Sequence, residues 1–300
     1  MKVSGILDVQ EGYMPFHGYQ TYYRIVGDHS STKTPLVLLH GGPGSTHNYF
    51  EGFDDLAAQT RRPVVMYDQL GCGRSSIPDD AQLWQATTWV AELQALRTYL
   101  GLAEIHLLGQ SWGGMLAIIY ACDYHPEGIK SLILASTLSS AQLWAQEQHR
   151  MIRLMSPVDQ VAIADAERQQ NFTSAAYLTA NQHFMEQHAS GPVTDADPEF
   201  LRRSKHAGTT AYRVAWGPNE YNPTGTLADY EYTEKLRQLQ VPTLVTSGTD
   251  DLCTPLVAKT MVDHLPNATW TLFPHSRHMA FIDETPVYMA RLQRWLVAHD

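Results

Sequence analysis

Short apolar runs separated by helical stretches are the feature of this sequence that most restricts its fold. The runs span residues 35–39, 63–67, 105–108, 131–135, 242–246 and 269–273. They are apolar at consecutive positions, so we expect each to be a strand buried on both faces of a parallel sheet. Helical periodicity fills the gaps, for example over residues 83–100, and Gly101 then stands where a helix-ending glycine is typical. The sequence therefore predicts an α/β fold with a doubly wound, mostly parallel central sheet.

Two further patterns divide the chain. Residues 3–9 and 19–26 alternate loosely between apolar and polar and predict an antiparallel hairpin ahead of the sheet. The strand–helix alternation stops near residue 139 and resumes near residue 241, and the segment between has helical spacing and is too long for a loop. We therefore expect a core domain made of residues 1–138 and 240–300, and a helical cap domain made of residues 139–239.

Composition narrows the classes of partner. The hydrophobic content of 44% supports a large core, and the formal net charge of -10 argues against nucleic acid, which binds clustered Lys and Arg. No apolar stretch approaches the ~18 residues of a membrane span, and the N-terminal segment does not resemble a secretory signal. We expect a cytoplasmic protein, or alternatively one attached to the cell envelope without a signal peptide. The three cysteines show no zinc-binding spacing, so we expect free thiols, no metal and no other cofactor.

The strongest motif lies between a predicted strand and a predicted helix. Residues 109–113 read Gly-Gln-Ser-Trp-Gly, after the strand at 105–108 and before a helix expected over 115–124. A strand-to-helix turn this tight strains the serine backbone, and the flanking glycines avoid steric clashes. The motif therefore predicts Ser111 as a nucleophile, presented at the carboxyl edge of the sheet near a helix N-terminus.

A second glycine-rich segment follows the first central strand. Residues 40–44 read His-Gly-Gly-Pro-Gly, and consecutive glycines let a backbone approach a substrate closely and direct N–H groups at it. A tetrahedral intermediate formed by Ser111 needs two such donors. We assign this oxyanion hole to the N–H groups of Gly42 and Trp112.

A serine nucleophile also needs a base and an orienting carboxylate, which follow it in the chain in this kind of fold. The loop after the late strand offers both Asp250 and Asp251; its spacing from the preceding glycine and the following proline favours Asp251 and leaves Asp250 as the alternative. After the last strand stand His275 and His278, and the usual loop length favours His278. Together with Ser111 these residues predict an α/β-hydrolase fold.

Four motifs taken together resemble one family of α/β-hydrolases. They are residues 40–44, residues 68–75 (Asp-Gln-Leu-Gly-Cys-Gly-Arg-Ser), residues 109–114 and residues 217–220 (Gly-Pro-Asn-Glu). Over nearly the whole chain the sequence is similar to the proline iminopeptidases, also called prolyl aminopeptidases, and most like those of lactic acid bacteria. The resemblance implies a metal-free aminopeptidase acting on small peptides with N-terminal proline, with the same three triad residues. We interpret residues 68–75 as a structural turn near the oxyanion loop.

The resemblance also implies that a cap glutamate holds the amino terminus of the substrate, and the motif places it at Glu220. A carboxylate suits this task because the ammonium of an N-terminal proline is costly to desolvate without one. The alternative is a surface glutamate in a Gly-Pro turn. Some relatives carry a second glutamate directly after the triad aspartate, where this chain has Leu252. Either Glu220 acts alone, or another acid such as Asp250 or Glu231 helps.

The predicted function is a serine aminopeptidase that releases N-terminal proline through an acyl-enzyme intermediate. The first alternative is an amino-acid amidase, esterase or lactonase of the same fold with broader specificity. The second is a catalytically inactive hydrolase fold that acts as a binding module, although the complete set of predicted site residues disfavours it. Three cap aromatics are candidates either for the proline ring pocket or for the core of the cap: Trp144, Tyr212 and Trp216.

Overall fold

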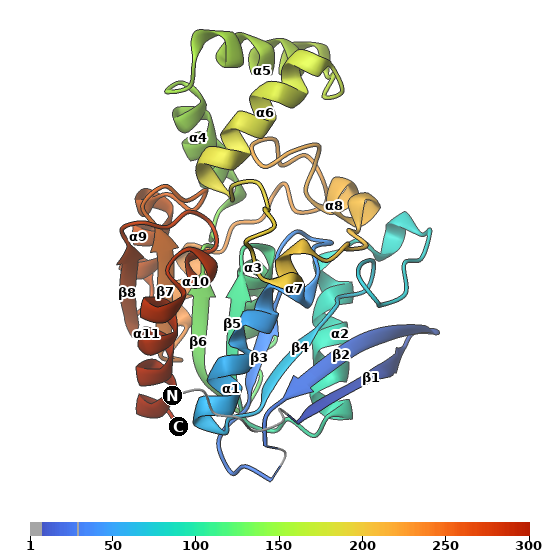
Figure 1. Ribbon diagram of the computed structural model, residues 1–300, viewed down its shortest axis with the longest axis vertical. Coiled ribbons are helices and arrows are strands. Elements are labelled where there is room, and N and C mark those ends of the chain that lie inside the picture. Colours follow the sequence, from blue (N-terminus) through green and yellow to red (C-terminus); the bar gives the residue numbers. More distant parts are fainter. Residues whose placement is uncertain (1–7, 29) are drawn as a thin grey trace.

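An eight-stranded sheet runs through the centre of the structure, a computed structural model that describes residues 8–28 and 30–300 (Figure 1). In chain order the strands are β1 (Val9–Phe16), β2 (Tyr19–Val26), β3 (Leu36–Leu39), β4 (Val64–Tyr67), β5 (Ile105–Gln110), β6 (Ile129–Ala135), β7 (Thr243–Gly248) and β8 (Ala268–Phe273). Their spatial order is β1-β2-β4-β3-β5-β6-β7-β8. The β1–β2 and β2–β4 pairs are antiparallel and the other pairs are parallel, which confirms the predicted mostly parallel sheet.

The helices connect these strands and cover both faces of the sheet. In chain order they are η1 (His47–Phe53), α1 (Asp54–Thr60), η2 (Ala81–Leu83), α2 (Ala86–Tyr99), α3 (Trp112–Asp123), α4 (Ala141–Ile152), α5 (Pro157–Gln169), α6 (Ala175–His188), α7 (Glu199–Arg202), α8 (Thr209–Ala215), η3 (Glu234–Gln238), α9 (Pro255–His264), α10 (Ala280–Asp283) and α11 (Thr285–Ala298). The elements labelled η are 3₁₀ helices.

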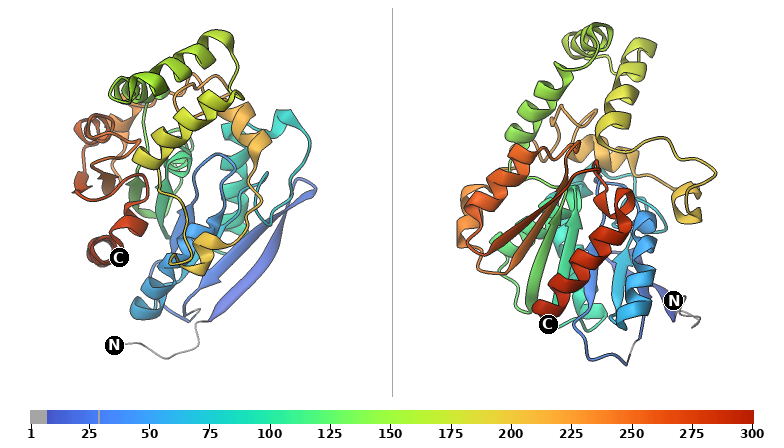
Figure 2. Two further views of the ribbon diagram at one scale, coloured as in Figure 1. Left: turned by 45° about the horizontal axis from the view of Figure 1, so that its top comes forward. Right: turned by 60° about the vertical axis from the view of Figure 1, so that its left-hand side comes forward.

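Strand β3 shows why its residues are apolar at every position. Val37 and Leu39 belong to the core that α2, α3 and α9 share with one face of the sheet. Leu36 and Leu38 belong to the separate core beneath α1 and α11 on the other face, and Figure 2 shows α11 crossing that face. Since all four side chains are fully buried, the expectation of a strand covered on both sides is confirmed for β3. It is wrong for the run at residues 269–273, because β8 is an edge strand whose residues are mostly exposed or half-buried.

The predicted hairpin has a different first strand. Residues 3–7 of the predicted strand lie outside the described residues, and the strand that pairs with β2 is β1, in the register Val9↔Val26 to Phe16↔Tyr19. The hairpin closes through His17 and Gly18, whose φ angles of 47° and 84° suit the two-residue turn that matches the twist of paired strands. The turn signal is weak because a histidine occupies the position where asparagine is usual.

The helix predicted over residues 83–100 is interrupted near its start. Residues 81–83 form the separate helix η2, and α2 begins only at Ala86. Its end agrees with the prediction, because Gly101 has a φ of 66° and donates its N–H to Thr98 O, while Leu102 N–H reaches Arg97 O. These two bonds form the glycine-dependent motif that satisfies the last carbonyls of a helix.

The segment between β6 and β7 carries helices α4 to α8, which lie within the residues predicted as a helical cap. Figure 1 shows α4, α5 and α6 rising beyond the carboxyl ends of the parallel strands, with α8 lower, beside the core. In the described part of this segment the one strand-like pairing is an isolated bridge between Ser140 and Glu231. No helix in residues 8–28 or 30–300 is long and apolar enough to cross a membrane.

Candidate active site

The tight turn between β5 and α3 holds the predicted nucleophile. Ser111 is the single residue between the two elements, and its φ of 57° and ψ of -123° are strained for a residue with a side chain. A Cβ at Gly109 would lie 2.2 Å from Gly113 O, and a Cβ at Gly113 would lie 2.0 Å from Leu39 O. Both positions therefore require glycine, as the motif predicts. The helix begins at Trp112 rather than at the expected residue 115, so Ser111 directly precedes its first turn.

This packing predicts a large cost for a side chain at position 113. The Gly113→Ala substitution is expected to lower the free energy of unfolding by about 3 kcal/mol, because the new methyl group must displace backbone atoms of β3. The matched control is Gly52→Ala, where the nearest atom to the new Cβ would lie at an ordinary 3.4 Å. Urea denaturation of both variants measures the difference. Equal stability of the two variants would contradict the packing described for the turn.

The glycine-rich loop after β3 lies directly against the nucleophile. A Cβ at Gly41 would lie 3.1 Å from the Cβ of Ser111. The Gly41 N–H donates to the Tyr49 hydroxyl at 2.6 Å, and that hydroxyl donates to Gln110 Oε1 at 2.9 Å, so the loop is tied to the residue before the nucleophile. Sequence reasoning missed this link, since Tyr49 belongs to no recognisable motif and Gln110 fills the position of the Gly-Gln-Ser-Trp-Gly motif that does not specify a residue type.

Two backbone donors near the nucleophile have no acceptor within residues 8–28 and 30–300. Among the residues that the structure describes, neither the N–H of Gly42 nor that of Trp112 donates a hydrogen bond. Gly42 has a φ of 113°, a conformation that favours glycine. Unpaired N–H groups at a helix N-terminus and a glycine loop suit an oxygen that develops negative charge. These two groups remain the predicted oxyanion hole.

The turn at residues 68–75 supports the oxyanion loop, which is made of residues 40–44. The Asp68 carboxylate accepts hydrogen bonds from the N–H groups of His47 and Arg74, both at 2.8 Å, and lies 2.7 Å from His47 Nδ1. Gln69 Oε1 accepts from the indole Nε1 of Trp112 at 2.8 Å. The turn therefore links the segment after the oxyanion loop to the first residue of α3, which supports the structural interpretation of this motif.

Cys72 lies inside the same turn and is fully buried. Its Sγ donates to Gln69 O at 3.2 Å, and burial raises the pKa of the thiol well above its usual value. A thiol that stays protonated is a poor nucleophile, so Cys72 serves packing in the turn.

The structure brings together one predicted aspartate and one predicted histidine. Asp251 Oδ1 lies 2.6 Å from His278 Nδ1, and the aspartate is 1% exposed. Three further donors satisfy the carboxylate: Ser136 Oγ at 2.6 Å, Gly248 N at 3.0 Å and Cys253 N at 2.8 Å. A buried carboxylate with this many donors is held in one orientation.

The two alternatives lie outside this arrangement. Asp250 is exposed, and its carboxylate makes no hydrogen bond to His278 in the described part of the structure. His275 is also exposed, and its N–H donates to Glu284 Oε2 at 2.9 Å. The geometry therefore favours Asp251, which the sequence preferred without deciding.

Ser136 is a functional contact that sequence reasoning missed. It follows β6 directly, adopts a φ of 49°, and donates its hydroxyl to Asp251. No local motif marks this serine. The available signal is its position at the carboxyl end of β6, the strand between those that carry Ser111 and Asp251, where active-site residues of parallel sheets gather.

The ring of His278 is held on one side and open on the other. With Nδ1 facing Asp251, this nitrogen carries the proton and Nε2 is the basic one. Within the described residues, neither Nε2 nor Ser111 Oγ has a hydrogen-bond partner in the protein. Gln110 Nε2 donates to His278 O at 3.3 Å, and the ring of Trp144 lies 6.0 Å from the imidazole. The residue before the nucleophile thus fixes the backbone of the histidine.

The predicted amine anchor Glu220 lies on the segment that follows α8. Its carboxylate accepts a hydrogen bond from the Tyr212 hydroxyl at 2.7 Å, and its backbone O accepts from Trp144 Nε1 at 2.9 Å. Burial raises the pKa of Glu220, while the Tyr212 hydroxyl and a positive charge on His278 oppose the rise. Trp144 contacts both Glu220 and His278, so this acid lies beside the predicted base rather than on the surface.

Position 252, where some relatives carry a second glutamate, is filled by an apolar side chain. Leu252 is buried and its carbonyl accepts from Gln148 Nε2 at 2.7 Å. The two acids considered as replacements, Asp250 and Glu231, are exposed, and in the described structure neither shares a hydrogen bond with Glu220. Of the acids predicted for amine recognition, the geometry favours Glu220 alone.

The cap aromatics do not form one group. Trp144 and Tyr212 both contact Glu220, as described above. Trp216 is buried, and its indole N–H has no hydrogen-bond partner among the described residues. Trp144 and Tyr212 therefore border the predicted site, whereas Trp216 packs in the interior without a defined polar contact.

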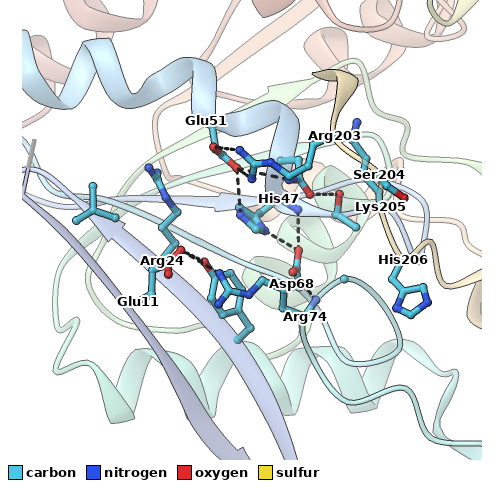
Figure 3. A pocket seen from close by; sticks show the side chains of 15 residues that line it. Glu11, Arg24, His47, Glu51, Asp68, Arg74, Arg203, Ser204, Lys205 and His206 are labelled. Atoms are coloured by element: carbon cyan, nitrogen blue, oxygen red, sulfur yellow. Dashed lines mark hydrogen bonds and ion pairs between the residues drawn. The ribbon is translucent and has the colours of Figure 1, made fainter. Parts of the chain in front are cut away.

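A cleft of about 790 Å³ elsewhere on the molecule is lined by charged side chains (Figure 3). Its acids and bases pair with one another: Arg203 with Glu51 at 2.8 Å, and His47 with Asp68 at 2.7 Å. Asp68 and Glu51 raise the pKa of His47 against the opposing effect of burial. None of the predicted catalytic residues is among the described residues that line it. We interpret the ion pairs along this cleft as contacts that hold residues 203–206 against the core.

No group of three or more His, Cys, Asp or Glu side chains in the described residues is placed to hold a metal ion. The site contains a serine at a strained turn, a paired aspartate and histidine, and two backbone donors without an acceptor in the described part of the chain. A family model described as alpha/beta hydrolase fold matches residues 34–285. The chain is therefore an alpha/beta hydrolase.

The chain is also highly similar to individual proteins over nearly its whole length. The chain is 85% identical to a proline iminopeptidase of Lactiplantibacillus plantarum, over 96% of this chain and 100% of that protein. It is 72% identical to a proline iminopeptidase of Levilactobacillus brevis, over 98% of both chains. The crystal structure of a Mycobacterium smegmatis proline iminopeptidase superposes with a TM-score of 0.85 at 30% identity, covering 97% of this chain and 98% of that chain. The chain belongs to the proline iminopeptidase family.

Proposed function

We propose that this protein is a prolyl aminopeptidase, a serine hydrolase that removes proline from the N-terminus of peptides. The observation that carries the proposal is Glu220, a carboxylate bonded to Tyr212 beside the predicted base His278. An acid in this position can receive the ammonium of a substrate whose first carbonyl is at the nucleophile. The same activity is supported by the relatives named proline iminopeptidase, which this chain matches over nearly their whole length.

In the proposed mechanism Glu220 first binds the secondary ammonium of the N-terminal proline. A charged amine loses much hydration on entering the site, and a charge-assisted hydrogen bond compensates for that loss. This contact sets the distance between the amino terminus and the scissile bond. A substrate with an acylated amine lacks the positive charge and adds bulk at the same place, so it is expected to bind poorly.

Ser111 then attacks the prolyl carbonyl while His278 takes its proton at Nε2. Asp251 keeps the imidazole in the required tautomer and stabilises the imidazolium that forms. The N–H groups of Gly42 and Trp112 receive the negative charge on the carbonyl oxygen. Protonated His278 gives its proton to the leaving amine, the shortened peptide departs, and water activated by His278 releases proline from the acyl-enzyme.

The experiment that tests this function compares arylamide substrates with and without a free amine. Prolyl-arylamide is expected to have the highest kcat/KM, alanyl-arylamide a lower one, and N-acetylprolyl-arylamide no measurable turnover. Comparable turnover of the acetylated substrate would favour the alternative, an amidase or esterase of the same fold. Comparable turnover of the prolyl and alanyl substrates would contradict the proline preference.

A substitution of the anchor tests the role of Glu220. Glu220→Gln is expected to lower kcat/KM for prolyl-arylamide by about 10- to 100-fold, because the amide keeps the shape but loses the charge that meets the ammonium. The matched control is Glu231→Gln, whose carboxylate is exposed and accepts from Thr233 N at 2.9 Å. Steady-state kinetics on both variants measure the difference. Equal losses in the two variants would remove Glu220 from the site.

A further inference from the structure

A second cleft begins at the oxyanion loop. It has a volume of about 580 Å³ and is lined on one side by residues 42–45. Residues 207–209, 217–218 and the side chains of Tyr212 and Arg213 form the rest of its lining. Because Gly42 supplies one of the predicted oxyanion donors and the Tyr212 hydroxyl binds Glu220, this cleft adjoins both the predicted oxyanion hole and the amine anchor.

The walls of this cleft are fixed by a backbone contact. Gly208 N–H donates to Gly44 O at 2.7 Å, and a Cβ at Gly44 would lie 2.4 Å from Gly208 O. Gly44 has a φ of 89°, which also favours glycine. Small residues and backbone therefore form most of the lining, and this leaves room for an extended peptide of varied side chains.

One cation that lines this cleft, Arg213, has no partner among the described residues. Arg213 is exposed, and in the described residues its guanidinium makes no hydrogen bond or ion pair. The contrast is Arg203, which is bound by both Glu51 and Glu199. Arg213 is also the one charged side chain among the described residues that line the cleft. In a chain of net charge -10, an unpaired arginine at this place is available to an anionic ligand.

We propose that this cleft binds the leaving part of the peptide substrate, and that Arg213 receives its C-terminal carboxylate. This inference rests on the proposed aminopeptidase function, which supplies a ligand whose carboxylate lies beyond the scissile bond at a distance set by the length of the peptide. Arg213 directly follows Tyr212 on α8, so this helix contacts the amine anchor with one residue and the carboxylate with the next. The site therefore favours short peptides over long ones.

The test compares peptides that differ only at their C-terminus. The substrates are prolyl dipeptides and tripeptides, each with a free carboxylate or an amide, and kcat/KM is measured for the wild type and for Arg213→Gln. In the wild type we expect a preference of about tenfold for the carboxylate at one of the two lengths, as for a charge-assisted contact at a partly exposed site. Arg213→Gln is expected to reduce this preference to nearly one and to leave prolyl-arylamide turnover unchanged.

Two further variants sharpen the result. Arg213→Lys keeps the charge and is expected to retain part of the preference, while Arg168→Gln, on α5 and outside the cleft, is expected to retain all of it. The preference is also expected to weaken as salt screens the contact. An equal carboxylate preference in the wild type and Arg213→Gln, or none in the wild type, would overturn this inference alone. Absence of prolyl-arylamide turnover in the wild type would overturn the proposed function as well.

Discussion

Replacement of Ser111 by alanine should lower kcat for prolyl-arylamide by about 10⁴-fold or more, to the level that binding and the oxyanion donors provide without a nucleophile. Ser111 is the side chain that the turn between β5 and α3 presents beside the oxyanion loop. Without its hydroxyl no acyl-enzyme forms, whichever residues surround it. Stopped assays with concentrated enzyme measure the remaining rate.

The control for this substitution is Ser190→Ala, an exposed serine of the segment between β6 and β7, which should keep full activity. A fluorophosphonate probe gives a second readout: it should label the wild type and Ser190→Ala but not Ser111→Ala. Turnover retained by Ser111→Ala would refute the assignment of the nucleophile. A wild type that the probe does not label would instead favour the inactive binding module.

The second large loss of activity is expected when Asp251 is replaced. Asp251→Asn should lower kcat by about 10³- to 10⁴-fold, since an amide can donate to His278 Nδ1 and so favour the tautomer with the proton on Nε2. The substitution is nearly isosteric and keeps an acceptor oxygen for Ser136 Oγ and Gly248 N, while Cys253 N loses its acceptor, so thermal denaturation should show a folded but less stable protein. Steady-state kinetics with prolyl-arylamide measure the loss.

Asp250→Asn is the matched control, one residue away and of the same chemistry. Its carboxylate is exposed, and the described structure gives it no bond to His278, so kcat should stay within about twofold of the wild type, as for a surface substitution. If Asp250→Asn were the slower of the two variants, the orienting acid would be Asp250 and the geometry around Asp251 would have another role.

The sheet and the tight turn that holds Ser111 could be predicted from the sequence because their signals are local. Consecutive apolar residues mark strands covered on both faces, and glycines flank Ser111 because neighbouring backbone leaves no room for a Cβ. The first strand was predicted wrongly because its local signal is weak. β1 is an edge strand whose residues are mostly exposed, so its polarity pattern is weak, and the turn that sets its register begins with His17.

The contacts that the sequence did not predict join residues far apart in the chain. Ser136 and Asp251 are 115 positions apart, and Trp144 and Glu220 are 76 apart. No short motif encodes such pairs, because they exist only once the strands are ordered in the sheet. Local signals do exist within the predicted cap: Ser140, Ser156 and Ser174 each cap a helix through the side chain and would have divided that segment correctly.

The neighbouring strands β6 and β7 have a consequence for synthesis of the chain. Strand β6 ends at Ala135, and its parallel partner begins only at Thr243, after the whole helical segment. At a ribosomal rate of roughly 5–20 residues per second, the edge of β6 stays unpaired for roughly 5–20 seconds. Unpaired edges of apolar strands join other chains readily. This interval is therefore when the nascent protein most needs protection from association with its own copies.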